Sequence, residues 1–101
     1  MANKMDLIFE VIDKTGRKIH LSKERWSHIR QEHTQIDNIE EIENTLKKPV
    51  KIISHEEGEL YDYYNYYKTK NSNSKYLKIV VKYLNGSGFV LTAYFVRNIN
   101  Q

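Results

Sequence analysis

The chain has 101 residues, of which 40% are hydrophobic and 29% charged, and its formal net charge is +3. A chain of this length holds one modest hydrophobic core, so we expect a single domain over residues 1–101. The absence of cysteine excludes a disulfide framework, a thiolate zinc site and a cysteine nucleophile. Asp6, Glu10 and Asp13 interrupt the first apolar stretch, so we expect no signal peptide, no membrane span and a cytoplasmic protein.

The first secondary-structure elements predicted along the chain are two strands and a helix. Residues 7–12 and 18–21 alternate as strands do, and a turn at 13–17 containing Gly16 joins them into a hairpin. Ser22 provides an N-cap hydroxyl for a helix from about Lys23 to His33. Trp26, Ile29 and His33 share one face of this helix.

A second helix and four strands are predicted next. Asp37 begins the helix, with Glu40 three residues on as in a capping box, and Pro49 stops it. Polar turns separate the four strands, which we expect at residues 50–53, 60–69, 76–84 and 89–97. The predicted fold is therefore α+β: two short N-terminal helices, preceded by a β-hairpin, packed on a four-stranded antiparallel sheet.

Charge is distributed unevenly along the chain. Residues 32–62 hold nine acidic residues against three Lys or Arg, whereas residues 63–101 hold six Lys or Arg and no acid. An acid-free stretch interleaved with tyrosines is typical of a surface that binds a polyanion such as RNA. Lysines that protect sheet edges against aggregation would give the same pattern, so both interpretations stay open.

Strand alternation predicts which side chains of the last strand share a face. Val90, Thr92, Tyr94 and Val96 are expected on one face, opposite Phe89, Leu91, Ala93, Phe95 and Arg97. A functional face would then combine Thr92 and Tyr94 with lysines or tyrosines of neighbouring strands. The register of the strands, and with it the lysine beside Thr92, does not follow from the sequence.

The order of these motifs resembles a known family. Gly-Arg-x-Ile-His-Leu-Ser-x-x-Arg-Trp-x-His-Ile-x-x-x-His runs over residues 16–33, and Val-Leu-Thr-Ala-Tyr over residues 90–94. Between them lie a helix ending at Lys48-Pro49 and a tyrosine-rich strand. This order resembles the Barnase-EndoU-colicin-RelE (BECR) nuclease superfamily, particularly its phage-associated branch, over residues 6–96. The resemblance implies a metal-independent ribonuclease without a cofactor, often used as a toxin and neutralised by an antitoxin or immunity protein.

Site residues follow from the resemblance position by position. The family's helix segment falls on Trp26, His28, Ile29 and His33, and its terminal Thr-x-Tyr on Thr92 and Tyr94. Metal-free RNA cleavage needs a base for the 2′-hydroxyl, an acid for the leaving 5′-oxygen, and cations or hydroxyls around the phosphorane. The expected catalytic residues are thus His28, His33, Thr92 and Tyr94. The residues expected to bind RNA are Arg30, Tyr67, Lys68, Lys78 and Lys82. Arg30 and the strand lysines are expected as cations at the phosphate, and Tyr67 and Lys68 match the family only in character.

Helix geometry leaves two alternatives for the histidines. Residues five apart on a helix point about 140° away from one another, so His28 and His33 cannot both face one site. Either the helix ends before His33 and the chain turns, or only one histidine is catalytic. No spacing of a zinc site, glycine-rich phosphate loop or nucleophile elbow is present. Two other functions stay open: an RNA-binding module without cleavage, and a protein-interaction module that uses the Tyr/Lys-rich sheet.

Overall fold

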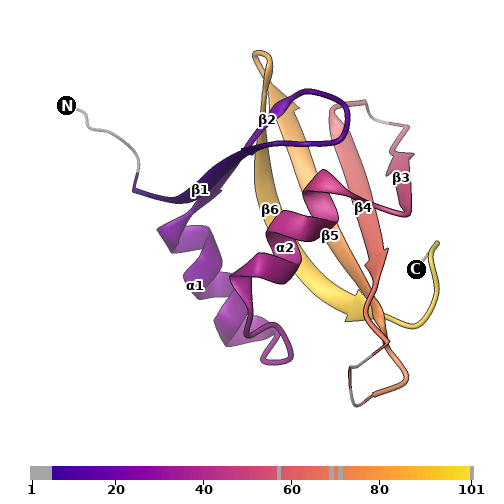
Figure 1. Cartoon of the computed structure of the whole chain (residues 1–101). Helices are drawn as coiled ribbons and strands as arrows, with labels where there is room; N and C mark the ends of the chain where they lie inside the picture. Colours follow the sequence, from indigo (N-terminus) through magenta and orange to yellow (C-terminus); the bar gives the residue numbers. More distant parts are fainter. Residues whose placement is uncertain (1–5, 57, 69, 71, 101) are drawn as a thin grey trace.

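A computed structural model of the chain describes residues 6–56, 58–68, 70 and 72–100 (Figure 1). Its elements, in chain order, are β1 (Leu7–Ile12), β2 (Lys18–Ser22), α1 (Lys23–Glu32), α2 (Ile39–Lys47), β3 (Lys51–Ser54), β4 (Leu60–Tyr66), β5 (Tyr76–Leu84) and β6 (Ser87–Val96). Every predicted helix and strand is present, with ends shifted by up to a few residues. Residues 1–5, and Thr69 at the end of one predicted strand, lie outside the described residues.

The predicted four-stranded antiparallel sheet is wrong. The sheet is mixed and has six strands, in the order β1-β2-β6-β5-β4-β3, because the N-terminal hairpin joins it through a parallel pairing of β2 with β6. Ile19 and Leu21 of β2 are apolar and completely buried. The hairpin can bury them only as part of the same layer as the other strands, since a two-stranded ribbon has no core of its own.

Gly88 permits this parallel pairing. Ile19 of β2 lies opposite Gly88, and a Cβ atom at Gly88 would lie 2.5 Å from Ile19 Cδ1 and 2.8 Å from Tyr83 Cε1. The turn itself is formed by Asn85 and Gly86, which both have positive φ, as a two-residue hairpin turn requires. The sequence pattern of residues 85–88 indicated only a turn, whereas Gly88 serves strand packing.

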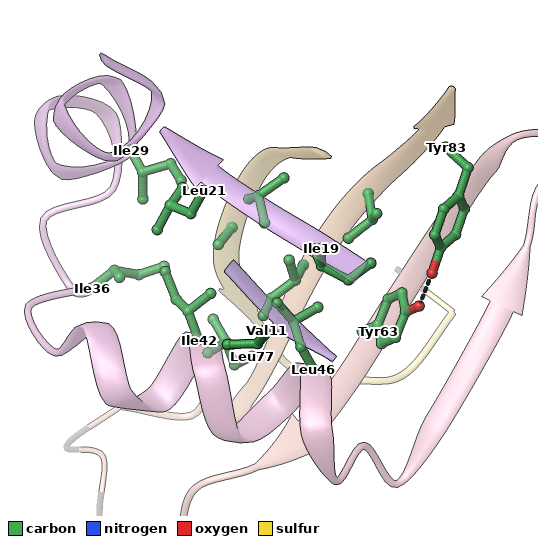
Figure 2. Close-up of a cluster of buried hydrophobic side chains, with 14 residues drawn as sticks. Val11, Ile19, Leu21, Ile29, Ile36, Ile42, Leu46, Tyr63, Leu77 and Tyr83 are labelled. Atoms are coloured by element: carbon green, nitrogen blue, oxygen red, sulfur yellow. Dashed lines mark hydrogen bonds between the residues drawn. The ribbon is translucent and has the colours of Figure 1, made fainter. Parts of the chain in front are cut away.

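Both helices cover the same face of the sheet, as Figure 1 shows. Ile29 of α1, and Ile42 and Leu46 of α2, are almost completely buried. They belong to one hydrophobic cluster with Leu77, Ile79 and Val81 of β5 (Figure 2). Within the described ranges, no helix combines the length and apolar character that a membrane span requires.

The helix caps agree with prediction at α1 and differ at α2. The Ser22 hydroxyl accepts a hydrogen bond from the Arg25 amide, as expected for an N-cap. At α2 the cap is Asn38 rather than Asp37, because the Asn38 side chain accepts from the Glu40 amide and α2 begins at Ile39.

A bulge in β6 changes the predicted faces of that strand. Val81 pairs with Val90 and Val80 with Thr92, so Leu91 is an extra residue on β6. Before the bulge Val90 is buried in the core, and after it Ala93 takes the core side. The prediction that Val90 shares a face with Thr92 and Tyr94 is therefore wrong. Thr92 lies on the face opposite the helices, which we call the helix-free face.

Candidate functional site

Neighbouring strands place three polar side chains side by side on the helix-free face. Lys78 in β5 is paired with Tyr64 of β4 on one side and with Tyr94 of β6 on the other. The Lys78 ammonium lies 5.4 Å from the centre of the Tyr94 ring. Because paired residues on neighbouring strands point to the same face, this register brings two hydroxyls and a cation into one row.

His33 reaches this row from the end of α1. The helix ends at Glu32, and His33 is its C-cap, with an amide that donates to the Ile29 carbonyl at 2.8 Å. The chain then leaves the helix, and the imidazole stacks on the Tyr94 ring with centroids 5.1 Å apart and planes 28° apart. The first alternative from helix geometry is thus the one observed: the helix ends before His33 and the chain turns.

The open edge of β6 makes this contact available. β2 pairs only with residues Ser87, Gly88 and Phe89 of β6, so in the described pairing the later half of that strand has no strand partner on this side. A cavity of about 310 Å³ lies here. Its lining residues are Glu32, His33, Thr34, Gln35, Tyr94 and Phe95. A ligand can therefore reach His33 and Tyr94 together.

A buried carboxylate adjoins the other side of Lys78. Asp62 is only 5% exposed, and its Oδ2 lies 3.7 Å from Lys78 Nζ and 3.0 Å from His55 Nε2. A second cavity, of about 320 Å³, opens beside these groups. It is lined by Ile53, Ser54, His55, Asp62, Tyr64, Lys78 and Asn100. The chain after β6 turns back toward β3 and so brings Asn100 to this cavity (Figure 1).

The surroundings keep Lys78 charged and Tyr64 protonated. Burial lowers the pKa of the Lys78 ammonium, but hydrogen bonding with Tyr94 and the nearby Asp62 carboxylate outweigh burial, so the pKa lies above its usual value. Burial raises the pKa of the Tyr64 phenol, and although the Lys78 charge opposes this effect, the net shift is upward. At neutral pH the row therefore offers one cation and at least one neutral hydroxyl donor.

Sequence reasoning missed Asp62 and gave His55 no role. One signal was available for Asp62, because an aspartate in the middle of a tyrosine-rich strand contradicts the usual composition of strands. No comparable signal marks His55, which lies in the connection between β3 and β4. Its proximity to Asp62 depends on how the two strands pair.

Two of the predicted residues on α1 lie apart from the row. The His28 side chain is 53% exposed and approaches Glu24 of the same helix at 4.0 Å. The Arg30 guanidinium is exposed and lies 5.6 Å from the Trp26 ring. Both contacts are local to α1.

The remaining predicted residues divide between the two faces. Thr92 and Lys82 lie on the helix-free face. Thr92 is paired with Val80, and Lys82 is paired with Leu60 on one side and Phe89 on the other. The Tyr67 hydroxyl instead donates to the Glu41 carbonyl at 2.9 Å and lies 3.0 Å from Thr45 Oγ1. It therefore ties the end of β4 to α2. Lys68 is exposed beyond β4.

Comparison with known proteins adds no relative. Neither a protein-family model, nor a curated protein, nor a solved structure matches the chain. Among the residues that the structure describes, no three His, Cys, Asp or Glu side chains converge as a metal site would require. The placement of His33, Tyr94 and Lys78 is thus the main guide to function.

Proposed function

We propose that the protein is a metal-independent endoribonuclease whose active site is formed by His33, Tyr94 and Lys78. The observation that carries this proposal is the stacking of His33 on Tyr94, with the Lys78 ammonium next to the same ring. These residues combine an imidazole, a hydroxyl and a cation, which are the kinds of group that metal-free phosphodiester cleavage needs. His33 and Tyr94 were also expected from the resemblance to BECR nucleases, and Lys78 was expected to bind RNA.

The proposed reaction is an intramolecular transesterification. The RNA 2′-oxygen forms a bond to phosphorus while the bond from phosphorus to the 5′-oxygen breaks, leaving a 2′,3′-cyclic phosphate and a 5′-hydroxyl. One group removes the 2′-hydroxyl proton and another protonates the leaving oxygen. We assign removal of the 2′-hydroxyl proton to the His33 imidazole and protonation of the leaving 5′-oxygen to the Tyr94 hydroxyl. Lys78 is assigned to the phosphorane, where a positioned cation stabilises developing negative charge.

The proposal also covers the residues that contact the RNA backbone, the location of the protein and its partner. Lys82 and Thr92 lie on the same face as the row and are assigned to the RNA backbone. As in the nucleases that the sequence resembles, we propose a toxin-like role in the cytoplasm and a neutralising antitoxin or immunity protein as partner.

Cleavage of a mixed structured and single-stranded RNA pool in EDTA tests the proposal. We expect cyclic-phosphate and 5′-hydroxyl ends from the wild-type protein. His33→Ala should lower the rate by about 10²- to 10⁴-fold, the usual contribution of a general acid or base. His28→Ala removes an imidazole from the same helix but from its solvent-facing side, so we expect a rate close to that of the wild type.

Two results would contradict this assignment. If the folded wild-type protein leaves all RNA intact, with and without ribosomes, the enzyme proposal is wrong. Salt-sensitive RNA binding without cleavage would then favour the RNA-binding module, whose lysines contact phosphates. If His28→Ala abolishes cleavage and His33→Ala does not, the reaction takes place elsewhere than at Tyr94.

A further inference from the structure

Two polar atoms of residues that line the second cavity, Asp62 Oδ1 and His55 Nε2, have no hydrogen-bond partner among the described residues. Asp62 Oδ1 is buried, and among the described residues no group donates a hydrogen bond to it. Leaving a buried carboxylate oxygen unpaired costs free energy, more than for a neutral acceptor. Asp62 is one of the residues that line the cavity of about 320 Å³, so a ligand that enters the cavity and displaces the atoms covering this oxygen can supply the missing donor. This volume is within the usual range of small-molecule sites.

The charge of Asp62 is already balanced. Its other oxygen, Oδ2, lies 3.7 Å from the Lys78 ammonium and 3.0 Å from His55 Nε2. The missing partner is therefore a neutral N–H or O–H donor rather than a second cation. Ile53 and Tyr64 add apolar and aromatic surface to the same cavity. A planar, neutral ligand that carries a donor beside acceptors fits these surroundings.

We propose that this cavity, the Asp62 cavity, binds an RNA base that carries an exocyclic amino group, and that it rejects uracil. The inference rests on the proposed ribonuclease function and names its base preference. The amino group of cytosine, adenine or guanine would donate to Asp62 Oδ1, as amino groups donate to carboxylates in base recognition. Uracil has one ring donor, N3–H, between two carbonyl oxygens that the carboxylate would repel.

Lys78 connects the Asp62 cavity to the proposed active site. Its ammonium lies 3.7 Å from Asp62 and 5.4 Å from the Tyr94 ring centre. A nucleotide whose base occupies the cavity would thus have its phosphate near Lys78, on the side that faces Tyr94. Base recognition would then position the scissile bond.

Binding of the four ribonucleoside 3′-monophosphates to the wild-type protein, followed by NMR titration, tests this inference. None of these ligands contains a bond that the proposed reaction cleaves. We expect the cytidine, adenosine and guanosine compounds to bind at least about tenfold more tightly than the uridine compound, as one hydrogen bond to a charged group implies. The largest shifts should occur at His55, Asp62 and Asn100.

A matched pair of variants tests the role of the carboxylate. Asp62→Asn should remove the preference, because an amide presents both a donor and an acceptor. Asp37→Asn makes the same chemical change at a side chain that is 69% exposed and should keep the preference. If the wild-type protein binds all four compounds equally, prefers uridine or binds none, the inference is wrong even if Asp62→Asn fails to fold.

Cleavage by the same wild-type sample separates the two proposals. RNA cleavage without a base preference in binding would overturn the base-binding role of the Asp62 cavity. The ribonuclease proposal would then still hold. A base preference without cleavage, both with and without ribosomes, would support the Asp62 cavity and overturn the ribonuclease proposal.

Discussion

Gly88 shows how a single missing side chain allows two parts of the sheet to meet. The side chains of Ile19 and Tyr83 both occupy the space where a Cβ atom at this position would lie. Ile19 is fully buried and Tyr83 is 8% exposed, so neither can move into solvent without loss of core packing. Gly88 is therefore required by packing between strands and not by its φ angle.

Gly88→Ala should destabilise the protein by about 1–3 kcal/mol, the usual cost of overpacking a core. Urea unfolding followed by circular dichroism would measure the change in the free energy of unfolding. Ser87→Ala alters the adjacent, half-buried position of β6 and should have a much smaller effect. Unchanged or increased stability of Gly88→Ala would show that Ile19 and Tyr83 repack without cost.

At the scale of elements, Asp13 fixes the β1–β2 turn to the rest of the sheet. Its Oδ1 accepts hydrogen bonds from the amides of Thr15 and Arg17 at 2.9 and 2.8 Å. Its Oδ2 accepts from the hydroxyls of Tyr63 in β4 and Tyr83 in β5. The two hydroxyls also contact each other (Figure 2). One carboxylate thus joins a turn to two strands.

These contacts predict how stability depends on pH. Burial raises the pKa of Asp13, but the bonds from Tyr63, the Arg17 amide, Thr15 and Tyr83 outweigh burial, so the pKa lies below the ordinary value of 3.8. Because the folded-state pKa is the lower one, this stabilisation is complete above the unfolded-state pKa. It is lost as the pH falls through the folded-state pKa.

Asp13→Asn should therefore be less stable than the wild type at pH 7, by about 2 kcal/mol. Between pH 5 and pH 2 it should lose less stability than the wild type. Urea unfolding at several pH values would measure both effects. Asp37→Asn, at an exposed carboxylate, should leave the wild-type pH profile nearly unchanged. An acid profile of Asp13→Asn identical to that of the wild type would contradict the role of this carboxylate.

At the scale of the whole molecule, basic side chains of the C-terminal part of the chain lie in two different environments. Lys70, after β4, lies 3.3 Å from Glu41 of α2, so an acid of the second helix offsets its charge. Lys82 lies on the helix-free face beside Phe89, whose ring stacks on His20 with centroids 5.1 Å apart. A lysine beside aromatic rings is the arrangement with which proteins bind single-stranded RNA.

Lys82→Gln should weaken RNA binding and reduce its dependence on salt. One lost phosphate contact lowers the slope of log K against log salt by about 0.7 for single strands. Fluorescence anisotropy at several salt concentrations, with a non-cleavable 2′-deoxy oligonucleotide, would measure the slope. Lys47→Gln removes a lysine from the last turn of α2, on the helix-covered side, and should leave the slope unchanged. Equal slopes for all three proteins would place RNA away from Lys82.

Local patterns predicted the elements of this fold well but not how the strands assemble. Ser22, Pro49 and the Asn85-Gly86 turn act within a few residues, so their consequences follow from the sequence. The parallel pairing of β2 with β6 and the bulge at Leu91 depend on tertiary packing and carry little local signal. Both change the sheet that the sequence predicted.

The candidate site was predicted in the same partial way. The resemblance to BECR nucleases pointed to His33 and Tyr94, and the basic strands pointed to Lys78 as an RNA-binding residue; the structure places these three together. The resemblance pointed equally to His28, which faces solvent. Asp62 and His55 are recognised as part of the candidate site only from the way the strands pair. The choice between two histidines needed the end of α1, whose position sequence periodicity fixes only to within a few residues.

The parallel pairing of β2 with β6 also sets the order in which the protein can assemble. His20 Nδ1 and the Gly88 carbonyl oxygen, 3.1 Å apart, are separated by 68 positions in the chain. Bringing two residues so far apart in the chain together costs chain entropy before the contacts of β6 compensate for it. This cost slows folding. During synthesis the first hairpin and both helices emerge before β6, and Tyr94 is on β6. A nascent chain therefore has no row of His33, Tyr94 and Lys78, and any activity of that row begins only after the last strand has docked.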